Sequence, residues 1–111
     1  MLYLLDSITD TQGITTRMLG LLPGSAAMQT RFTALGMQQL DDGVPGMLTG
    51  HTFHYSRVST PLAPVGHATR AQSDAPGEAV YRRGSIVATY MHGYWPSNPA
   101  FAAALFHGRA F

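Results

Sequence analysis

The chain is short, rich in apolar residues and poor in charged ones. Its 111 residues suffice for one domain or for part of one. Apolar residues make up 45% and charged residues 12%, against about 25% charged residues in an ordinary domain. We therefore expect more protein to cover part of the surface, either a further domain or a second copy of the chain. The net charge of +1, without any run of like charge, gives no indication of nucleic-acid binding.

Two residue types are missing, and their absence excludes several kinds of site within these residues. There is no cysteine, which excludes a disulfide framework, a thiolate zinc site and a cysteine nucleophile. All seven basic residues are arginine, and without lysine no phosphate-binding loop of the Gly-Lys-Ser/Thr type can form. No apolar stretch approaches about 18 residues, and the apolar start carries no basic residue. We expect no membrane span, no secretion signal and a cytoplasmic protein.

The first half of the chain predicts one helix followed by strands. Residues 1–10 have apolar side chains spaced as i, i+3, i+4 and i+7, which is typical of a short amphipathic helix. This helix has no capping residue at its start, so we expect the domain to begin upstream of Met1. Residues 31–40 predict a strand that is broken near Gly36. Residues 49–57 predict the clearest strand, because polar and aromatic side chains alternate there.

The second half predicts a loop, a hairpin and a final helix. Residues 59–77 are rich in proline, alanine and glycine and predict a long surface loop. Residues 78–83 and 85–92 predict two strands joined at Arg83–Gly84, and the second has apolar residues on both faces, which is typical of a central strand. Asn98 and Pro99 predict the start of a helix whose buried stripe consists of Phe101, Leu105 and Phe106. We expect an α/β fold, with a mixed sheet flanked by helices, that forms the second half of a larger domain.

His92 is the first candidate for chemistry, since it ends an apolar run and precedes a loop. A histidine exchanges a proton near neutral pH and can act as a general base. A histidine at a strand end can equally be a hydrogen-bonded structural residue. The sequence pattern alone leaves both interpretations open.

The segment from Gly50 to Ser56 is the second candidate. His51 and His54 are three residues apart, and strand alternation places them on opposite faces, so they make a poor metal pair. We expect no metal site, and a histidine-based one is the weakest alternative. The segment is better interpreted as a pocket-lining strand whose polar residues have either structural or ligand partners. Its candidate binding residues are His51, His54, Tyr55 and Ser56.

Several stretches resemble the C-terminal part of the cobyrinic acid a,c-diamide synthase family. They are "MLYLLDSITD", "GLLPG", "LTGHTFHYS" and "YRRGSIVATYMHGYWPSNPAFAAALF", with a shorter match over residues 31–36. The related cobyric acid synthases commonly have Glu where this sequence has Thr52, which favours the a,c-diamide synthases. The resemblance implies the second half of a class I-like, flavodoxin-like glutamine amidotransferase domain, truncated just after the turn that carries its nucleophilic cysteine. His92 matches the catalytic histidine of the family, and residues 51–56 lie by analogy beside the glutamine site.

The resemblance also implies a reaction and its partners. Glutamine would be hydrolysed, and the ammonia would amidate the a and c carboxylates of a corrinoid, cobyrinic or hydrogenobyrinic acid. No cofactor is expected in these residues, whereas ATP and Mg²⁺ are implied for an N-terminal synthetase domain that they do not include. Class I glutaminases usually have a carboxylate two residues after the histidine, where this sequence has Tyr94. The alternative is a non-catalytic amidotransferase-like module that binds a partner protein, because the chain lacks the cysteine.

Overall fold

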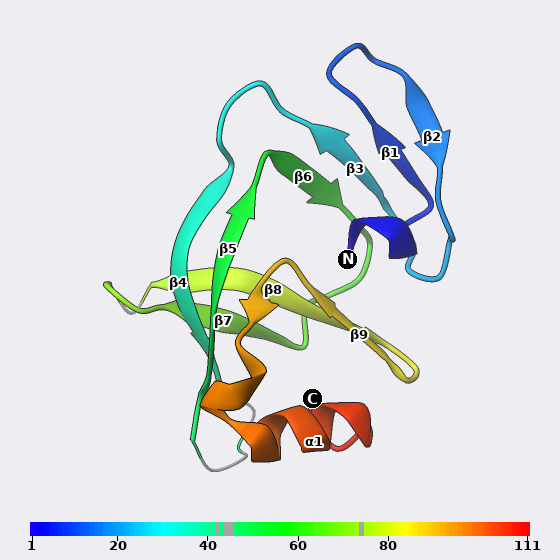
Figure 1. Cartoon of the computed structure of the whole chain (residues 1–111). Coiled ribbons are helices and arrows are strands. Elements are labelled where there is room, and N and C mark those ends of the chain that lie inside the picture. Colours follow the sequence, from blue (N-terminus) through cyan, green and yellow to red (C-terminus); the bar gives the residue numbers. More distant parts are fainter. Residues whose placement is uncertain (42, 44–45, 74) are drawn as a thin grey trace. The chain divides into compact units, whose positions relative to one another are not determined.

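The chain folds into two compact units, shown as a computed structural model in Figure 1. The structure describes residues 1–41, 43, 46–73 and 75–111. The first unit comprises Met1–Ala34 and His54–Ala63, and the second comprises Leu35–Phe53 and Pro64–Phe111. The longest helix in the described part of the chain has eight residues, too few to cross a membrane.

The first unit is built on a small mixed sheet with the strand order β2-β1-β3-β6. Its two central strands are β1 and β3, which pair parallel with each other; β1 pairs antiparallel with β2, and β3 pairs antiparallel with β6. A carboxylate oxygen of Asp6 accepts a hydrogen bond of 2.8 Å from the Gly24 N–H, and the Asp6 N–H donates to the Gly24 carbonyl. This reciprocal pair fixes the chain between β2 and β3. The elements are η1 (Leu2–Leu4), β1 (Ser7–Thr9), β2 (Thr15–Arg17), β3 (Ser25–Met28) and β6 (Ser56–Ser59).

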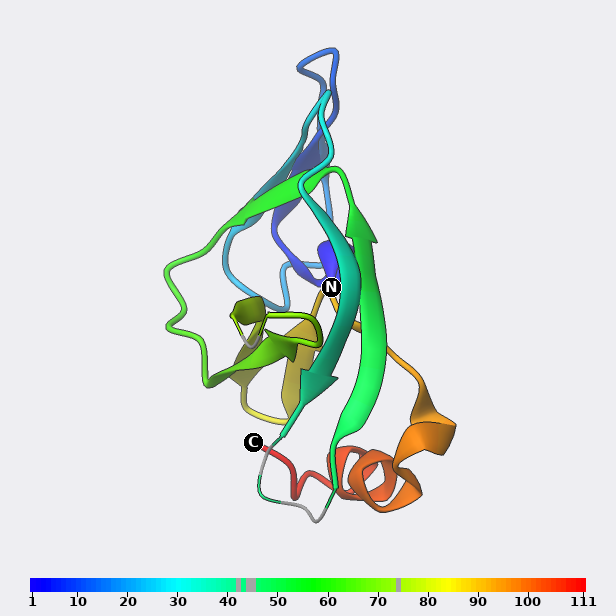
Figure 2. The ribbon, with the colours of Figure 1, turned by 90° about the vertical axis from the view of Figure 1, so that its left-hand side faces the viewer.

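The second unit is built on a six-stranded sheet with the strand order β10-β5-β4-β7-β8-β9. The pairs β4–β7, β7–β8, β8–β9 and β10–β5 are all antiparallel. The long strands β4 and β5 are neighbours in this sheet and run side by side in Figure 2. The elements are β4 (Ala34–Leu40), β5 (Leu48–His54), β7 (Gly66–Arg70), β8 (Pro76–Arg83), β9 (Ile86–Thr89), β10 (His92–Gly93), η2 (Trp95–Ser97) and α1 (Pro99–Phe106).

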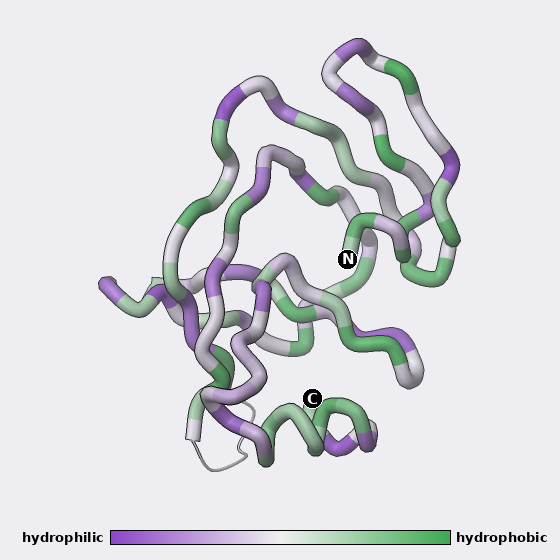
Figure 3. Tube along the Cα trace, in the orientation of Figure 1, coloured by the Kyte–Doolittle hydropathy of each residue, from purple (hydrophilic) through white to green (hydrophobic). Residues whose placement is uncertain are grey.

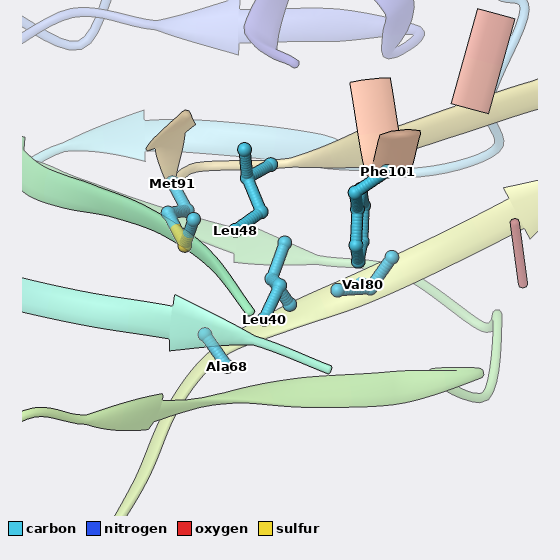
Figure 4. Close-up of a cluster of buried hydrophobic side chains, with 6 residues drawn as sticks. All are labelled: Leu40, Leu48, Ala68, Val80, Met91 and Phe101. Atoms are coloured by element: carbon cyan, nitrogen blue, oxygen red, sulfur yellow. The ribbon is translucent and has the colours of Figure 1, made fainter. Parts of the chain in front are cut away.

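The core of the second unit draws one side chain from each of β4, β5, β7, β8 and α1, and one from the segment before β10. Phe101 of α1 is fully buried and is the largest member of this cluster. Figure 4 shows its ring next to the Val80 side chain, together with the other members of the same cluster. The cluster therefore ties the helix and the residue preceding His92 to the same sheet. Its members are Leu40, Leu48, Ala68, Val80, Met91 and Phe101.

A partly buried polar contact shows that this sheet is strongly coiled. The Thr52 hydroxyl on β5 donates a hydrogen bond of 2.7 Å to the Glu78 carboxylate on β8. Two strands, β4 and β7, separate β5 from β8 in the sheet order. In a flat sheet strands three places apart would lie roughly 14 Å from one another. The sheet must therefore curve so that Thr52 and Glu78 meet across its inner face.

The hairpin and the final helix confirm two predictions that rested on local sequence. Arg83 pairs with Ile86, which leaves a two-residue turn led by Gly84 at φ +59°. Figure 3 shows the change in hydropathy across this turn, from the hydrophilic end of β8 to the hydrophobic start of β9. At the helix, the Asn98 side chain accepts a 2.9 Å hydrogen bond from the Phe101 N–H, with Pro99 at the first helical position.

The helix predicted over residues 1–10 is wrong. Only Leu2–Leu4 form a 3₁₀ turn, and Ser7–Thr9 form β1 between two partner strands. Backbone pairing with β2 and β3 outweighs the helical spacing of the apolar residues. The predicted α/β fold is confirmed: the described residues form a small mixed α/β domain with two sheets, and its single α-helix lies at the C-terminal end.

The predicted strands and loop also differ from the structure in their boundaries. β4 continues through Gly36 without a break. Gly36 has a φ of +141°, which glycine adopts without strain. The strand predicted over 49–57 divides at Tyr55 into β5 and β6. The loop predicted over 59–77 contains β7, which is held between β4 and β8. Phe106 is 77% exposed and does not belong to the buried stripe of the last helix.

Candidate active site

His92 lies on β10, a two-residue strand at the edge of the six-stranded sheet. The strand predicted over 85–92 is in fact two strands, and β9 and β10 occupy opposite ends of the sheet order. The central position expected from the apolar residues on both faces is therefore wrong. β10 pairs only with β5, with His92 opposite His51 and Gly93 opposite Gly50. His92 is exposed, so in this structure its ring is accessible to a small molecule or to another protein segment.

A close backbone approach fixes the position of β10 on β5. A Cβ atom added to Gly50 would lie 2.3 Å from the His92 carbonyl oxygen and 2.8 Å from the Met91 Cε atom. Only glycine leaves room for this approach. Met91 is buried in the core cluster, so the residue before His92 is anchored on the inner face. The absence of a side chain at Gly50 thus allows the histidine strand to lie close to the sheet.

The chain after β10 is fastened to the same strand. The Tyr94 N–H donates a 2.8 Å hydrogen bond to the Thr49 carbonyl oxygen. The Ser97 hydroxyl accepts a 2.9 Å hydrogen bond from the Thr49 N–H and lies 2.7 Å from the Tyr94 carbonyl oxygen, to which it donates. The backbone on the C-terminal side of His92 is therefore held through the backbone N–H and the backbone carbonyl of Thr49.

The two histidine rings of this site stack on each other. The centroids of the His51 and His92 rings are 5.2 Å apart, and the ring planes are inclined by 22°. Both residues are exposed, and paired residues of an antiparallel ladder project from the same face of a sheet. The structure therefore assembles two of the five residues that the sequence singled out. An accessible imidazole in this setting can take up and release a proton during a reaction.

The other three predicted site residues have structural partners in the first unit. The His54 Nδ1 atom lies 2.9 Å from the Ser56 carbonyl oxygen. The Tyr55 ring packs edge-on against the Phe32 ring at a centroid distance of 4.6 Å. Ser56 is buried and pairs with Met28 in the β3–β6 ladder. The segment 50–56 is therefore not one continuous strand, because its last three residues belong to a different unit from His51, and its role beside a glutamine pocket stays a prediction.

The pairing of buried Thr52 with half-buried Glu78 is a contact that the sequence did not reveal. Thr52 is 1% exposed. Its partner Glu78 is held through its backbone as well, since the Glu78 N–H donates a 2.8 Å hydrogen bond to the Gln38 side chain. The feature of the sequence that could have indicated this contact is the polar residue at position 52, within a strand of alternating side chains. The partner could not be named, because Glu78 follows a Pro-Gly pair that indicates a turn.

No group of three or more potential metal ligands is found among the residues that the structure describes. A cavity of about 310 Å³ lies in the second unit between β4 and the segment after β7. None of the five predicted site residues lines it. Its lining residues are Leu35, Gly36, Met37, Gln38, Arg70, Gln72 and Ser73.

Comparison with known proteins identifies the family to which the chain belongs. The CobB/CobQ-like glutamine amidotransferase domain matches residues 1–100, so the chain belongs to this family of glutamine amidotransferase domains.

Within this family, the chain is similar to proteins named cobyrinate or hydrogenobyrinate a,c-diamide synthase. A cobyrinate a,c-diamide synthase of Herminiimonas arsenicoxydans is 45% identical over 106 residues, which are 96% of this chain and 24% of that protein. A hydrogenobyrinate a,c-diamide synthase of Stutzerimonas stutzeri is 48% identical over 106 residues, 95% of this chain and 24% of that protein. A protein of the same name from Pseudomonas aeruginosa is 45% identical, with the same coverage. The chain thus spans about a quarter of the length of these relatives.

Proposed function

We propose that this chain supplies the histidine side of the glutaminase site of a cobyrinate or hydrogenobyrinate a,c-diamide synthase. The observation that carries the proposal is His92, an exposed histidine fixed by β5 in a glutamine amidotransferase domain. Relatives at 45–48% identity bear both synthase names, which supports this reaction class without separating the two corrinoid substrates.

The proposed chemistry needs a thiol that these 111 residues do not contain. His92 would accept the thiol proton while the sulfur forms a bond to the side-chain amide carbon of glutamine. As the C–N bond breaks, His92 would return this proton to the leaving nitrogen, which departs as ammonia. Water would then attack the thioester, giving glutamate and restoring the thiol. The cysteine would come from protein outside this segment.

The ammonia would serve a second reaction, also outside these residues. A carboxylate of the corrinoid would be activated by ATP with Mg²⁺ as an acyl phosphate, and ammonia would displace phosphate to form the amide. These residues include no lysine-bearing phosphate loop and are proposed to bind neither ATP nor Mg²⁺.

The test compares two nitrogen donors in the complete gene product that contains this chain. With glutamine as donor, His92→Asn should reduce amidation at least 100-fold, the order of magnitude of a general acid–base contribution. With ammonium chloride as donor, the same variant should retain the wild-type amidation rate. His67→Asn, an exposed histidine of β7, is the matched control and should retain both rates. An unchanged glutamine-dependent rate in His92→Asn would refute the role of His92.

The second candidate function is a non-catalytic module that binds a partner protein, and the absence of cysteine favours it. The two functions differ in what the complete gene product does. We expect the purified 111-residue chain to release no ammonia from glutamine under either function. Glutamine-dependent ammonia release by the complete gene product would rule out the binding module, whereas its absence would favour it.

A further inference from the structure

We infer that His51 is a positioning residue for His92: its ring, stacked from the neighbouring strand, holds the imidazole of His92 in the orientation required for proton transfer. This inference rests on the proposed function, because it concerns the same glutaminase site. It assigns to β5 a role beyond that of lining a glutamine pocket.

The backbone contacts of β10 fix the position of the His92 backbone but not the orientation of its ring. Pairing with β5 and the close approach at Gly50 determine the position of the His92 Cα atom. The imidazole can still turn about two side-chain bonds. His92 is exposed, so core packing does not restrict this rotation. A proton-transfer group whose ring rotates freely spends part of its time in unproductive orientations.

The His51 ring supplies the missing restraint. Cross-strand partners in an antiparallel pair lie on the same face of a sheet, so the register itself brings the two side chains together. The centroid distance of 5.2 Å and the interplanar angle of 22° are those of an offset stack. A stack contacts the faces of the rings and leaves the nitrogen atoms at their edges accessible to a thiol and to glutamine.

No carboxylate takes this role in the described part of the chain. Among the described residues, the His92 ring contacts one other ring, that of His51, and has no side-chain hydrogen bond or ion pair. Tyr94 projects an exposed side chain two residues further on, and a phenol lacks the charge with which a carboxylate would orient an imidazole. The stack is therefore the restraint that this structure provides.

The experiment measures glutamine hydrolysis by the complete gene product in three variants. His51→Ala removes the ring and should lower kcat about tenfold, while KM for glutamine changes less than about twofold, because orientation of a reacting group affects the chemical step. His51→Phe restores a flat ring without nitrogen atoms and should recover kcat to within about threefold of wild type. His67→Ala makes the same change at an exposed position of β7 and should leave both constants unchanged. Circular dichroism establishes that each variant is folded.

Each outcome separates this inference from the proposed function. If His92→Asn abolishes hydrolysis while His51→Ala has wild-type kcat, the positioning role is refuted and the proposed function stands. If His51→Phe is as slow as His51→Ala, stacking is not the means by which His51 acts, and the inference fails. A raised KM with unchanged kcat in His51→Ala would also overturn it, since His51 would then bind glutamine instead. If hydrolysis survives His92→Asn, the proposed function itself is wrong.

Discussion

Replacement of Gly50 by alanine tests whether the close approach of β10 to β5 places His92. The added Cβ atom would lie 2.3 Å from the His92 carbonyl oxygen, about 1 Å less than the ~3.3 Å at which carbon and oxygen normally meet. The obstructing atoms include the backbone of His92 itself, which cannot rotate away as a side chain can. To make room, β10 must move outward by about 1 Å or its pairing with β5 must break. Either change displaces His92.

The expected magnitudes follow from this displacement. Overpacking of this kind typically costs about 1–3 kcal/mol of unfolding free energy. A shift of about 1 Å in a catalytic group can lower the rate about 100-fold. We therefore expect Gly50→Ala in the complete gene product to have a lower thermal midpoint and a kcat for glutamine hydrolysis about 100-fold below wild type.

The matched control is Gly66→Ala on β7. There the added Cβ would lie 3.4 Å from the Phe111 ring, an ordinary contact, so stability and kcat should be nearly unchanged. The assay is steady-state glutamate formation, together with thermal unfolding followed by circular dichroism. A folded Gly50→Ala variant with wild-type kcat would refute the reasoning, because His92 would then hold its position without the close approach of the two strands.

Two further predictions concern stability. Thr52→Val keeps the shape of a side chain that is 1% exposed but removes the hydroxyl that donates to Glu78, so urea unfolding should show a free energy of unfolding lower by about 1–3 kcal/mol. Thr52→Ser keeps the hydroxyl and should lose less of this free energy. Equal losses in the two variants would argue against the hydrogen bond. Asn98→Ala removes the acceptor for the Phe101 N–H and should cost about 1 kcal/mol, whereas Asn98→Asp retains an acceptor and should cost less. Indistinguishable thermal midpoints for the two Asn98 variants would contradict the capping role.

The pair of His51 and His92 illustrates how much of the candidate site could be predicted from the sequence. His92 could be selected from the sequence, since it ends an apolar run and precedes a loop. His51 could be named as a candidate, but nothing local indicated that it faces His92. Their contact depends on the antiparallel register of β10 and β5, and a shift by one residue would turn the side chains to opposite faces. Register between strands so far apart in the chain is a property of the tertiary fold.

The features that the sequence determined by itself are those whose interactions span only a few neighbouring residues. The turn at Gly84 and the helix start at Asn98–Pro99 require particular backbone angles and one nearby hydrogen bond, so their residue types identify them. The tertiary structure alone decided that residues 66–70 form β7 and that residues 7–9 form β1. Strand formation there depends on hydrogen bonds to partners distant in sequence, and these pairings outweigh the local tendencies to loop and helix.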